Sequence, residues 1–566
     1  NGLRSDVTEA DQTVSNGITA FNGDGYTLGT DAGNSGYNFN NYTYASWTFR
    51  KAPKFFDVVT WTGDGSAQQT ISHSLDSEIG FVAVKRTDST GNWVTYHRSV
   101  GEGAYMRLNT TDAKITSSNS FINMGTSTFD AYDYINISGA TYVAYLFAHD
   151  AGGFGDDGEQ NVISCGSYTG TGVVGNEVTL GFEPQWLLVK SSSLSENWWL
   201  VDVMRGMPVE DYTGAKGLRP NTSNTEATPF GLYPTATGFV LADGGGAINQ
   251  NNATYIYIAI RRGPMKTPES GTEVFAPEYG LNASAGGQAW SAGFPVDMYI
   301  RKNPTGGTNY IASRMTGNGP YMATDSTAAE SSIPYSEKLD NMDGVFTTNA
   351  YDYRTWISWM FKRAPGFMDV VAYTTEIGSF TRPHNLGVAP EIMILKNRGG
   401  FGWYFMSSAA GTDKTFFMQT SIAPYISRSY WPTDPDASNL YLGGQGGAYP
   451  YIAYLFASLA GISKCGSYTG TGADLNVDCG FSSGARFVLI KRYDGTQGSN
   501  VGDWYVWDSA RGIVAGNDPY LLLNSTAAEN TSTDYIDPLA SGFTVTSSAP
   551  AALNASGGSY IFLAIA

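Results

Sequence analysis

The chain has 566 residues, and because a domain usually holds about 100–200 residues, this length predicts three to five domains. Charged residues make up only 15% of the sequence, while 68 residues are glycine and 14% are aromatic, a balance that suits strands and turns better than solvated helices. The net charge of −18 disfavours nucleic acid and anionic membrane surfaces as partners. No apolar run reaches the roughly 18 residues of a membrane-spanning helix. We therefore expect an all-β protein with no nucleic-acid partner and no membrane insertion.

Long internal repeats dominate the sequence. CGSYTGTG occurs at 165–172 and again at 465–472, and RKAPKFFDVV at 50–59 returns as KRAPGFMDVV at 362–371. YVAYLFA at 142–148 likewise returns as YIAYLFA at 451–457. A unit of about 300 residues is thus present nearly twice.

A shorter period lies within this unit and is marked by a strand that carries tryptophan in four of its five copies. These copies are NWVTYHRSVG (92–101), NWWLVDVMRG (197–206), NYIASRMTG (309–317), GWYFMSSAAG (402–411) and DWYVWDSARG (503–512). Short alternating runs separated by Gly, Asn, Ser and Asp turns are typical of antiparallel β-sandwiches. The sequence predicts a tandem array of antiparallel β-sandwich modules, of jelly-roll or lectin-like type and about 100 residues each, with helices limited to short turns.

In chain order we expect the C-terminal half of a module at residues 1–54, module A1 at 55–160, B1 at 161–265, C at 266–365, A2 at 366–461 and B2 at 462–566. The half module follows from residues 8–54, which match the end of module C. Such a half must be completed by upstream residues, by the next module or by another subunit, because it would expose a sheet edge and an apolar face. We expect the sequence to be a window of a longer protein; a processed chain completed by a partner is the alternative.

The tryptophan strand supplies the candidate binding residues. Trp93, Trp198, Trp403 and Trp504 share one register, which we expect to pack on the inner face of each sandwich. Their neighbours then point to the opposite face, where the rings of Trp199, Tyr404 and Tyr505 are either exposed platforms that stack on sugars or packing contacts between modules.

No residue pattern indicates catalysis, so we expect no enzyme and no catalytic residues. Asp202 with Arg205, and Asp508 with Arg511, recur in the B modules and predict a local ion pair that closes a turn. A catalytic pair would need a second carboxylate or a nucleophile at a matched position. HxxxH, HExxH and P-loop patterns do not occur, which excludes the common zinc and nucleotide sites.

One loop is rich in oxygen ligands. Asp150, Asp156, Asp157 and Glu159 lie between modules A1 and B1, and Ca²⁺ prefers such hard ligands. The matching loop at 458–464 contains no acid, so the alternative is a solvated linker. Apart from Ca²⁺, no cofactor is expected. Of the three cysteines, Cys479 is expected to be a small buried hydrophobe, and a bridge to Cys465 is disfavoured because Cys165 has no matching partner.

The B modules resemble a tandem-repeat family of bacteriophage structural, tail-fibre-like proteins whose modules often lie beside concanavalin A-like or laminin-G-like domains. The resemblance rests on GSYTGTG with GFEPQWLLVK (181–190) and NWWLVDVMRG in B1, and on FVLIKR (487–492), DWYVWDSARG, LLLNSTAAE (521–529) and YIFLAI (560–565) in B2. Modules C and A lose the Asp or Arg of this pattern, so no invariant chemical site is implied.

This resemblance implies a structural virion protein on the surface of the phage particle, in a tail fibre, spike or other appendage. It also implies a homo-oligomer, specifically a trimer, with other virion proteins and a host surface glycan as partners. A bacterial extracellular adhesin or carbohydrate-binding repeat protein is the second hypothesis. A polysaccharide-degrading enzyme is the third, and it would require paired carboxylates.

Overall fold

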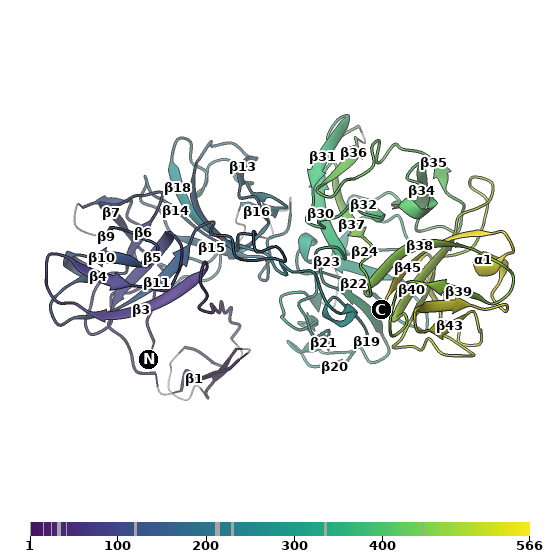
Figure 1. Cartoon of the computed structure of the whole chain (residues 1–566), viewed down its shortest axis with the longest axis horizontal. Helices are drawn as coiled ribbons and strands as arrows, with labels where there is room; N and C mark the ends of the chain where they lie inside the picture. Colours follow the sequence, from purple (N-terminus) through teal and green to yellow (C-terminus); the bar gives the residue numbers. More distant parts are fainter. Residues whose placement is uncertain are drawn as a thin grey trace. The chain divides into compact units, whose positions relative to one another are not determined.

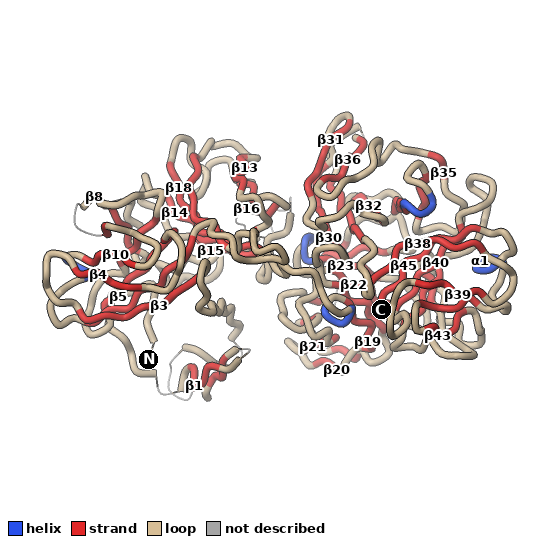
Figure 2. The backbone as a smooth tube through the Cα atoms, in the orientation of Figure 1, coloured by secondary structure: helices blue, strands red, loops and turns tan. Residues whose placement is uncertain are grey.

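The computed structural model describes residues 2–14, 16–23, 25–30, 36–40, 42–117, 121–209, 215–227, 231–332, 337–444 and 446–566. Antiparallel strands dominate, and the described helices are single turns (Figure 2). These are α1 (Ala551–Asn554) and the 3₁₀ turns η1 (Asp133–Ile135), η2 (Gly271–Glu273), η3 (Arg314–Thr316) and η4 (Ser408–Ala410). The expectation of an all-β protein with only short helical turns is confirmed for the described residues. None of their helices is long and apolar enough to span a membrane.

The chain divides into two compact units. The first comprises Asn1–Arg205 with Tyr212–Arg262, and the second comprises Gly206–Asp211 with Gly263–Ala566. Within each unit, every named sheet stays inside one stretch that the repeats delimit. We call these stretches segments and keep the names A1, B1, C, A2 and B2 with the residue bounds given above.

Before segment A1, the described N-terminal residues form a small hairpin. Its strands β1 (Ile18–Phe21) and β2 (Tyr26–Leu28) pair with each other, and their side chains are largely exposed. Residues 2–12 instead run along segment A1, where the Asp11 N–H donates to the Thr87 carbonyl over 3.0 Å.

Segment A1 contains a six-stranded sheet in the order β3-β11-β5-β6-β7-β8 and a three-stranded sheet in the order β4-β10-β9 (Figure 1). The strands are β3 (Phe56–Thr62), β4 (Gln69–Ser72), β5 (Ile79–Arg86), β6 (Val94–His97), β7 (Ala104–Arg107), β8 (Ile115–Thr116), β9 (Phe121–Ile122), β10 (Thr128–Ala131) and β11 (Thr141–Ala148).

Segment B1 contains the sheets β12-β18-β14-β15 and β13-β17-β16. The strands are β12 (Ile163–Thr169), β13 (Asn176–Thr179), β14 (Pro184–Ser191), β15 (Trp199–Asp202), β16 (Leu232–Thr235), β17 (Gly238–Leu241) and β18 (Thr254–Arg261).

Segment C contains the sheets β19-β29-β22-β23-β24-β25, β21-β27-β26 and β20-β28. The strands are β19 (Phe275–Tyr279), β20 (Asn282–Ala283), β21 (Gln288–Trp290), β22 (Met298–Lys302), β23 (Tyr310–Ser313), β24 (Pro320–Ala323), β25 (Ser331–Ser332), β26 (Glu337–Lys338), β27 (Val345–Thr347), β28 (Tyr351–Asp352) and β29 (Ile357–Phe361).

Segment A2 contains the sheets β30-β37-β32-β33-β34-β35 and β31-β36. The strands are β30 (Met368–Thr374), β31 (Ser379–Pro383), β32 (Ile392–Asn397), β33 (Trp403–Ser407), β34 (Lys414–Phe417), β35 (Tyr425–Ile426), β36 (Asn439–Gly443) and β37 (Pro450–Phe456).

Segment B2 contains the sheets β38-β45-β40-β41-β42 and β39-β44-β43, and α1 precedes its last strand (Figure 1). The strands are β38 (Ser463–Thr469), β39 (Leu475–Asp478), β40 (Phe487–Arg492), β41 (Tyr505–Asp508), β42 (Leu521–Leu522), β43 (Ile536–Leu539), β44 (Gly542–Val545) and β45 (Ser559–Ile565).

The core of B2 shows how the two sheets of a segment pack. Val477 and Phe543 of the small sheet share one buried cluster with Val488 and Phe562 of the large sheet. The central strands β5, β14 and β40 are buried on both faces, which explains why they read as continuous apolar runs rather than as alternating ones. Their second face is covered by a neighbouring segment, as described below.

The repeated CGSYTGTG stretch has a steric explanation. It forms the edge strands β12 and β38, in which Cys165 pairs with Ile258 and Cys465 with Leu563. A Cβ atom at the following Gly166 would collide with the ring of Tyr257 on the paired strand, and one at Gly466 would collide with Phe562. Glycine is therefore needed where an aromatic ring of the neighbouring strand crosses the backbone.

Candidate functional site

The tryptophans of the repeated strand join one segment to the next. All four are buried, but Trp504 packs on Phe405 of segment A2, with ring centroids 4.7 Å apart, and lies outside the core cluster of its own segment. Each indole Nε1–H donates to a carbonyl of the preceding stretch: Trp93 to Arg4 (2.9 Å), Trp198 to Arg107 (3.0 Å), Trp403 to Ala323 (2.7 Å) and Trp504 to Thr420 (3.2 Å). The expected inner-face packing of this register is therefore wrong, because these rings cover the opposite face of the large sheet.

Because the tryptophans face a neighbouring stretch, the rings proposed for sugar stacking lie on the other face of the strand, which is turned toward the core of their own segment. Tyr404 and Tyr505 are 7% and 9% exposed and belong to the cores of A2 and B2. Tyr404 stacks on Tyr430, with ring centroids 3.7 Å apart, so neither tyrosine offers a free face to a sugar. Trp199 is half-buried, with the Arg219 guanidinium carbon 5.2 Å from its ring centroid. Of the three candidates, Trp199 is the most exposed to solvent.

A buried lysine accompanies each of these strands. Lys85, Lys190, Lys302, Lys396 and Lys491 are all at most 1% exposed. The Lys491 ammonium donates to the Ser421 carbonyl of segment A2 over 3.0 Å and lies 5.9 Å from the ring centroid of Trp504. Burial lowers the pKa of Lys491 to about 7 and the pKa values of Lys190, Lys302 and Lys396 to about 8. Each ammonium group donates to a backbone carbonyl of a neighbouring stretch, and all but that of Lys302 also donate to a carbonyl of their own strand or loop.

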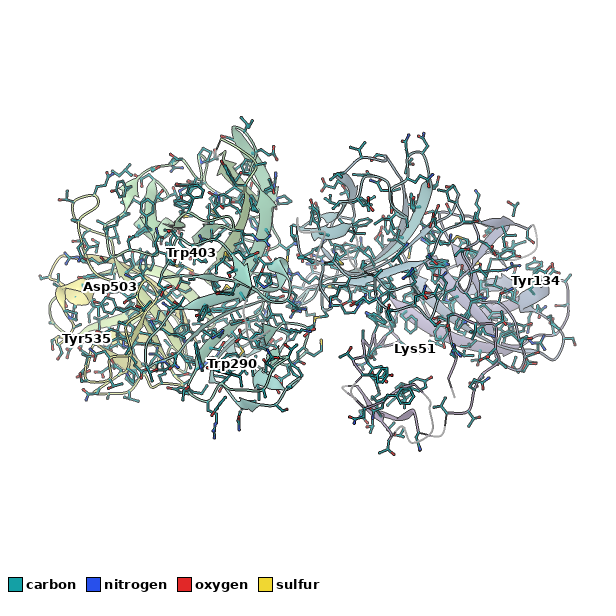
Figure 3. The ribbon with its side chains drawn as sticks, turned by 180° about the vertical axis from the view of Figure 1, so that it is seen from behind. Lys51, Tyr134, Trp290, Trp403, Asp503 and Tyr535 are labelled. Atoms are coloured by element: carbon teal, nitrogen blue, oxygen red, sulfur yellow. The ribbon has the colours of Figure 1, made fainter. Side chains whose placement is uncertain are left out.

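In the second unit these contacts close a cycle of three segments. Trp403 of A2 (Figure 3) reaches segment C, and Trp504 of B2 reaches A2. Segment C carries Asn309 at the tryptophan position, and its amide donates to the Leu523 carbonyl of B2 over 3.0 Å. Lys302 repeats the lysine contact, donating to the Ser525 carbonyl over 2.6 Å. Each segment therefore contacts both others through equivalent elements.

Aromatic rings gather where the three segments of the second unit meet. Phe361 of C packs edge-on against Phe456 of A2 and Phe487 of B2, with ring centroids 5.8 and 6.2 Å apart. The first unit repeats this arrangement: Phe49 lies 5.4 Å from Phe147 of A1 and 5.9 Å from Trp186 of B1. Phe49 stands where Phe361 stands in the second copy of the long repeat.

The Asp and Arg of the B segments form the expected ion pairs. Arg205 Nε lies 2.6 Å from the Asp202 carboxylate, and Arg511 Nε lies 2.6 Å from Asp508. Each arginine also binds a second acid, Glu226 at 2.7 Å in B1 and Glu529 at 3.0 Å in B2. The arginines thus hold a turn and a following loop together, as a structural pair would.

The acidic loop between A1 and B1 does not gather its carboxylates. Asp150 accepts a hydrogen bond from the Ser164 hydroxyl at 3.2 Å and lies 3.3 Å from His149, whereas Asp157 accepts the N–H of Glu159 at 2.9 Å. Among the described residues, no three of Asp150, Asp156, Asp157 and Glu159 bring ligand atoms within 4.8 Å of one another. Their contacts are those of a solvated turn.

All three cysteines are free thiols buried in the protein. Burial raises the pKa of Cys479 to about 12 and raises that of Cys465 as well, so both stay protonated. They act as small apolar side chains.

Sequence reasoning missed two sets of contact residues. Trp47 and Trp359, which bind the Asp of the B segments, sit at equal positions of the long repeat, 312 residues apart. The buried lysines follow the apolar runs at one register, in IGFVAVK, WLLVK, MYIRK, IMILK and FVLIK. A lysine that recurs after an apolar run was the available signal for a buried cation.

Fold and contacts together define an all-β repeat protein in which the same contacts recur between successive segments. The chain belongs to the DUF7483 family, described as a domain of unknown function, whose model matches residues 1–264 and 357–566. No curated protein matches the chain.

Proposed function

We propose that the chain is a structural protein of a bacteriophage virion, part of a tail fibre, spike or other surface appendage. It would be built from tandem jelly-roll or lectin-like β-sandwich modules of about 100 residues. The proposal is supported by the motifs of the B segments, which resemble phage structural repeats, and by the all-β architecture. The protein would lie on the outer surface of the particle and contact other virion proteins.

The closed cycle of the second unit is the observation that favours a structural role. Its three segments are joined through buried rings, lysines and asparagine rather than through exposed linkers. Breaking one such contact would leave buried carbonyls without donors, which costs about 1–3 kcal/mol for each group. A block joined in this way resists bending between its segments, a property that suits an appendage.

We extend the proposal to assembly as a homotrimer. In the second unit, the contacts between segments close within one chain, so a trimer would use other surfaces of the protein. Mass photometry of the full chain tests this part. A particle of three times the 60.7 kDa chain mass is expected, and a monodisperse monomer would overturn it.

Host recognition is the second element of the proposal, and it rests on Trp199. This ring is partly open to solvent and is flanked by Arg219, an arrangement that suits a sugar with an anionic group. Tyr404 and Tyr505 drop out of this role because both rings are buried.

Labelling with antibodies raised against the full chain tests the virion assignment. Gold label on the appendages of purified phage particles is expected, together with peptides of the chain in the particle proteome. Label on the surface of uninfected bacteria, with none on particles, would favour the adhesin hypothesis instead. Polysaccharide hydrolysis by the purified chain would overturn the non-catalytic assignment.

A further inference from the structure

Segment B2 holds three aspartates whose carboxylate oxygens meet. Asp518 lies in the loop between β41 and β42, Asp534 precedes β43, and Asp537 lies on β43. One oxygen from each carboxylate lies within 4.8 Å of the other two. The fold thus brings the loop that contains Asp518 next to strand β43, and the three side chains that meet there are all acidic.

Asp518 is fully buried, and its oxygens are incompletely satisfied by the protein. Its Oδ2 accepts the backbone N–H groups of Tyr535 and Ile536, both at 3.3 Å, while its Oδ1 has no hydrogen-bond partner within the described protein. The buried Asp534 Oδ1 and Thr533 Oγ1 lack such partners as well. Buried oxygens without donors are costly, and here three of them occur on residues of one small region.

Within the described parts of the chain, no basic side chain pairs with these carboxylates. None of the ion pairs among the described residues includes Asp518, Asp534 or Asp537. Burial and the neighbouring carboxylates raise the pKa of Asp518 to about 7 and raise that of Asp534. Like charges at this spacing are stable only with a shared proton or with a bound cation.

The matching segment B1 shows that the fold does not need these acids. The bridge Gly217 to Ala227 corresponds to Tyr520 to Asn530, and by this register Ala215 stands where Asp518 stands. Strand β16 pairs with β17 as β43 pairs with β44, which places Tyr233 at the position of Asp537. Ala215 and Tyr233 are neutral, so at these two positions the acids of B2 are a local addition to a common framework.

We propose that Asp518, Asp534 and Asp537 bind a Ca²⁺ ion in segment B2. All ligand atoms offered are hard oxygens from carboxylates, which Ca²⁺ accepts in irregular arrangements of six to eight ligands. The Thr533 hydroxyl and water would complete the coordination. The ion would tie the 518 loop to strand β43 and neutralise the buried charge. This site is independent of the proposed virion function.

Thermal unfolding of the full chain in EDTA and in 10 mM CaCl₂ tests the site. With an affinity in the range of extracellular calcium modules, about 10⁻⁴ to 10⁻³ M, Ca²⁺ should raise the melting temperature by roughly 2–4 °C. Asp518→Asn should abolish this rise, and in EDTA it should melt no lower than the wild type because it removes charge repulsion. The control Glu177→Gln alters an exposed acid of B1 and should keep the full response.

Terbium provides a second, local readout. Tyr535 (Figure 3) directly follows Asp534, and its ring stacks on Tyr520 at 5.6 Å, so Tb³⁺ in the site should emit on tyrosine excitation. Ca²⁺ should displace Tb³⁺ and so remove this emission. Asp537→Asn should weaken the emission, and this variant remains available as a test if Asp518→Asn fails to fold. A wild type whose melting is unchanged by Ca²⁺ overturns the proposal and favours a shared proton. An equal Ca²⁺ response in both Asp variants overturns it as well, because the ion then binds elsewhere.

Discussion

The indole Nε1–H of Trp359 donates a hydrogen bond to the Asp508 carboxylate over 2.8 Å, and this contact joins segment C to segment B2. Trp47 makes the same contact with Asp202 over 3.2 Å in the first unit. In both copies the partner arginine lies over the indole ring, with its guanidinium carbon 5.4 Å from the ring centroid for Arg205 and Trp47 and 5.7 Å for Arg511 and Trp359. One carboxylate thus receives a donor from a neighbouring segment and a cation from its own.

Asp508→Ala should destabilise the second unit by about 3–5 kcal/mol. The substitution leaves the Arg511 guanidinium, which is 1% exposed, without its nearest counter-charge and removes the acceptor of Trp359. Chemical unfolding followed by tryptophan fluorescence measures the change. As a control, Asp352→Ala removes the exposed partner of Arg354 and should leave the unfolding curve where it was.

The strand content and the repeats could be predicted from sequence because they depend on local alternation and on self-similarity. Which face of the repeated strand is turned toward the core could not be predicted. Trp504 and Tyr505 are adjacent and both aromatic, so alternation places them on opposite faces without saying which face is the core. Only the packing of Trp504 on Phe405 of another segment settles this, and that contact spans 99 residues. Contacts between segments leave little trace in a single sequence.

The same limit applies to the acids. The loop containing Asp150 and Asp157 is dense in sequence but does not converge in space. Asp518 and Asp537 are 19 residues apart, and the fold brings their carboxylates together. Spacing along the chain therefore misdirected the search for a cation site, because in a β-sandwich neighbours on a sheet come from distant turns.

Lys491→Met should weaken the contact between B2 and A2. Methionine keeps the volume of the side chain but cannot donate to the carbonyls of Ser421 and Gly502, and leaving them unpaired should cost about 2–4 kcal/mol. Hydrogen exchange should become faster at residues 421–423 and 499–502, where the two segments pair. Lys464→Met changes a half-buried lysine of the same segment and should leave exchange there unaltered.

Stability of the first unit should fall as the pH drops from about 6.5 to 4. His97 is buried, and its Nε2–H donates to the Tyr257 carbonyl over 3.0 Å while Nδ1 accepts the Ser99 N–H over 3.1 Å, so the neutral ring is held on both sides. Burial lowers the pKa of His97 to about 4, whereas the unfolded ring titrates near 6.5.

In this window the unfolded chain binds the proton and the folded chain does not, so the free energy of unfolding falls by about 1.4 kcal/mol per pH unit. His97→Gln keeps an N–H donor without the titration and should give a flatter pH profile of the melting temperature. Some slope should remain because burial also lowers the pKa values of His73 and His149, which lie in the same unit. An unchanged slope in the variant would show that His97 does not carry the effect.

Trp199→Ala should abolish binding of the protein to host-surface glycan while leaving the fold intact. The half-buried ring would stack on a sugar, and its loss removes the flat apolar surface together with the cation–π contact to Arg219, worth about 0.5–1 kcal/mol at an exposed site. Each site would bind weakly, and repetition in an oligomer would raise the effective strength by roughly 10²-fold to 10⁴-fold.

Glycan arrays measure the loss of binding, and melting curves measure separately whether the fold of the variant is intact. Tyr505→Phe, at the matching buried position of B2, should bind as the wild type does. Loss of several degrees of melting temperature with glycan binding retained would instead assign Trp199 to packing.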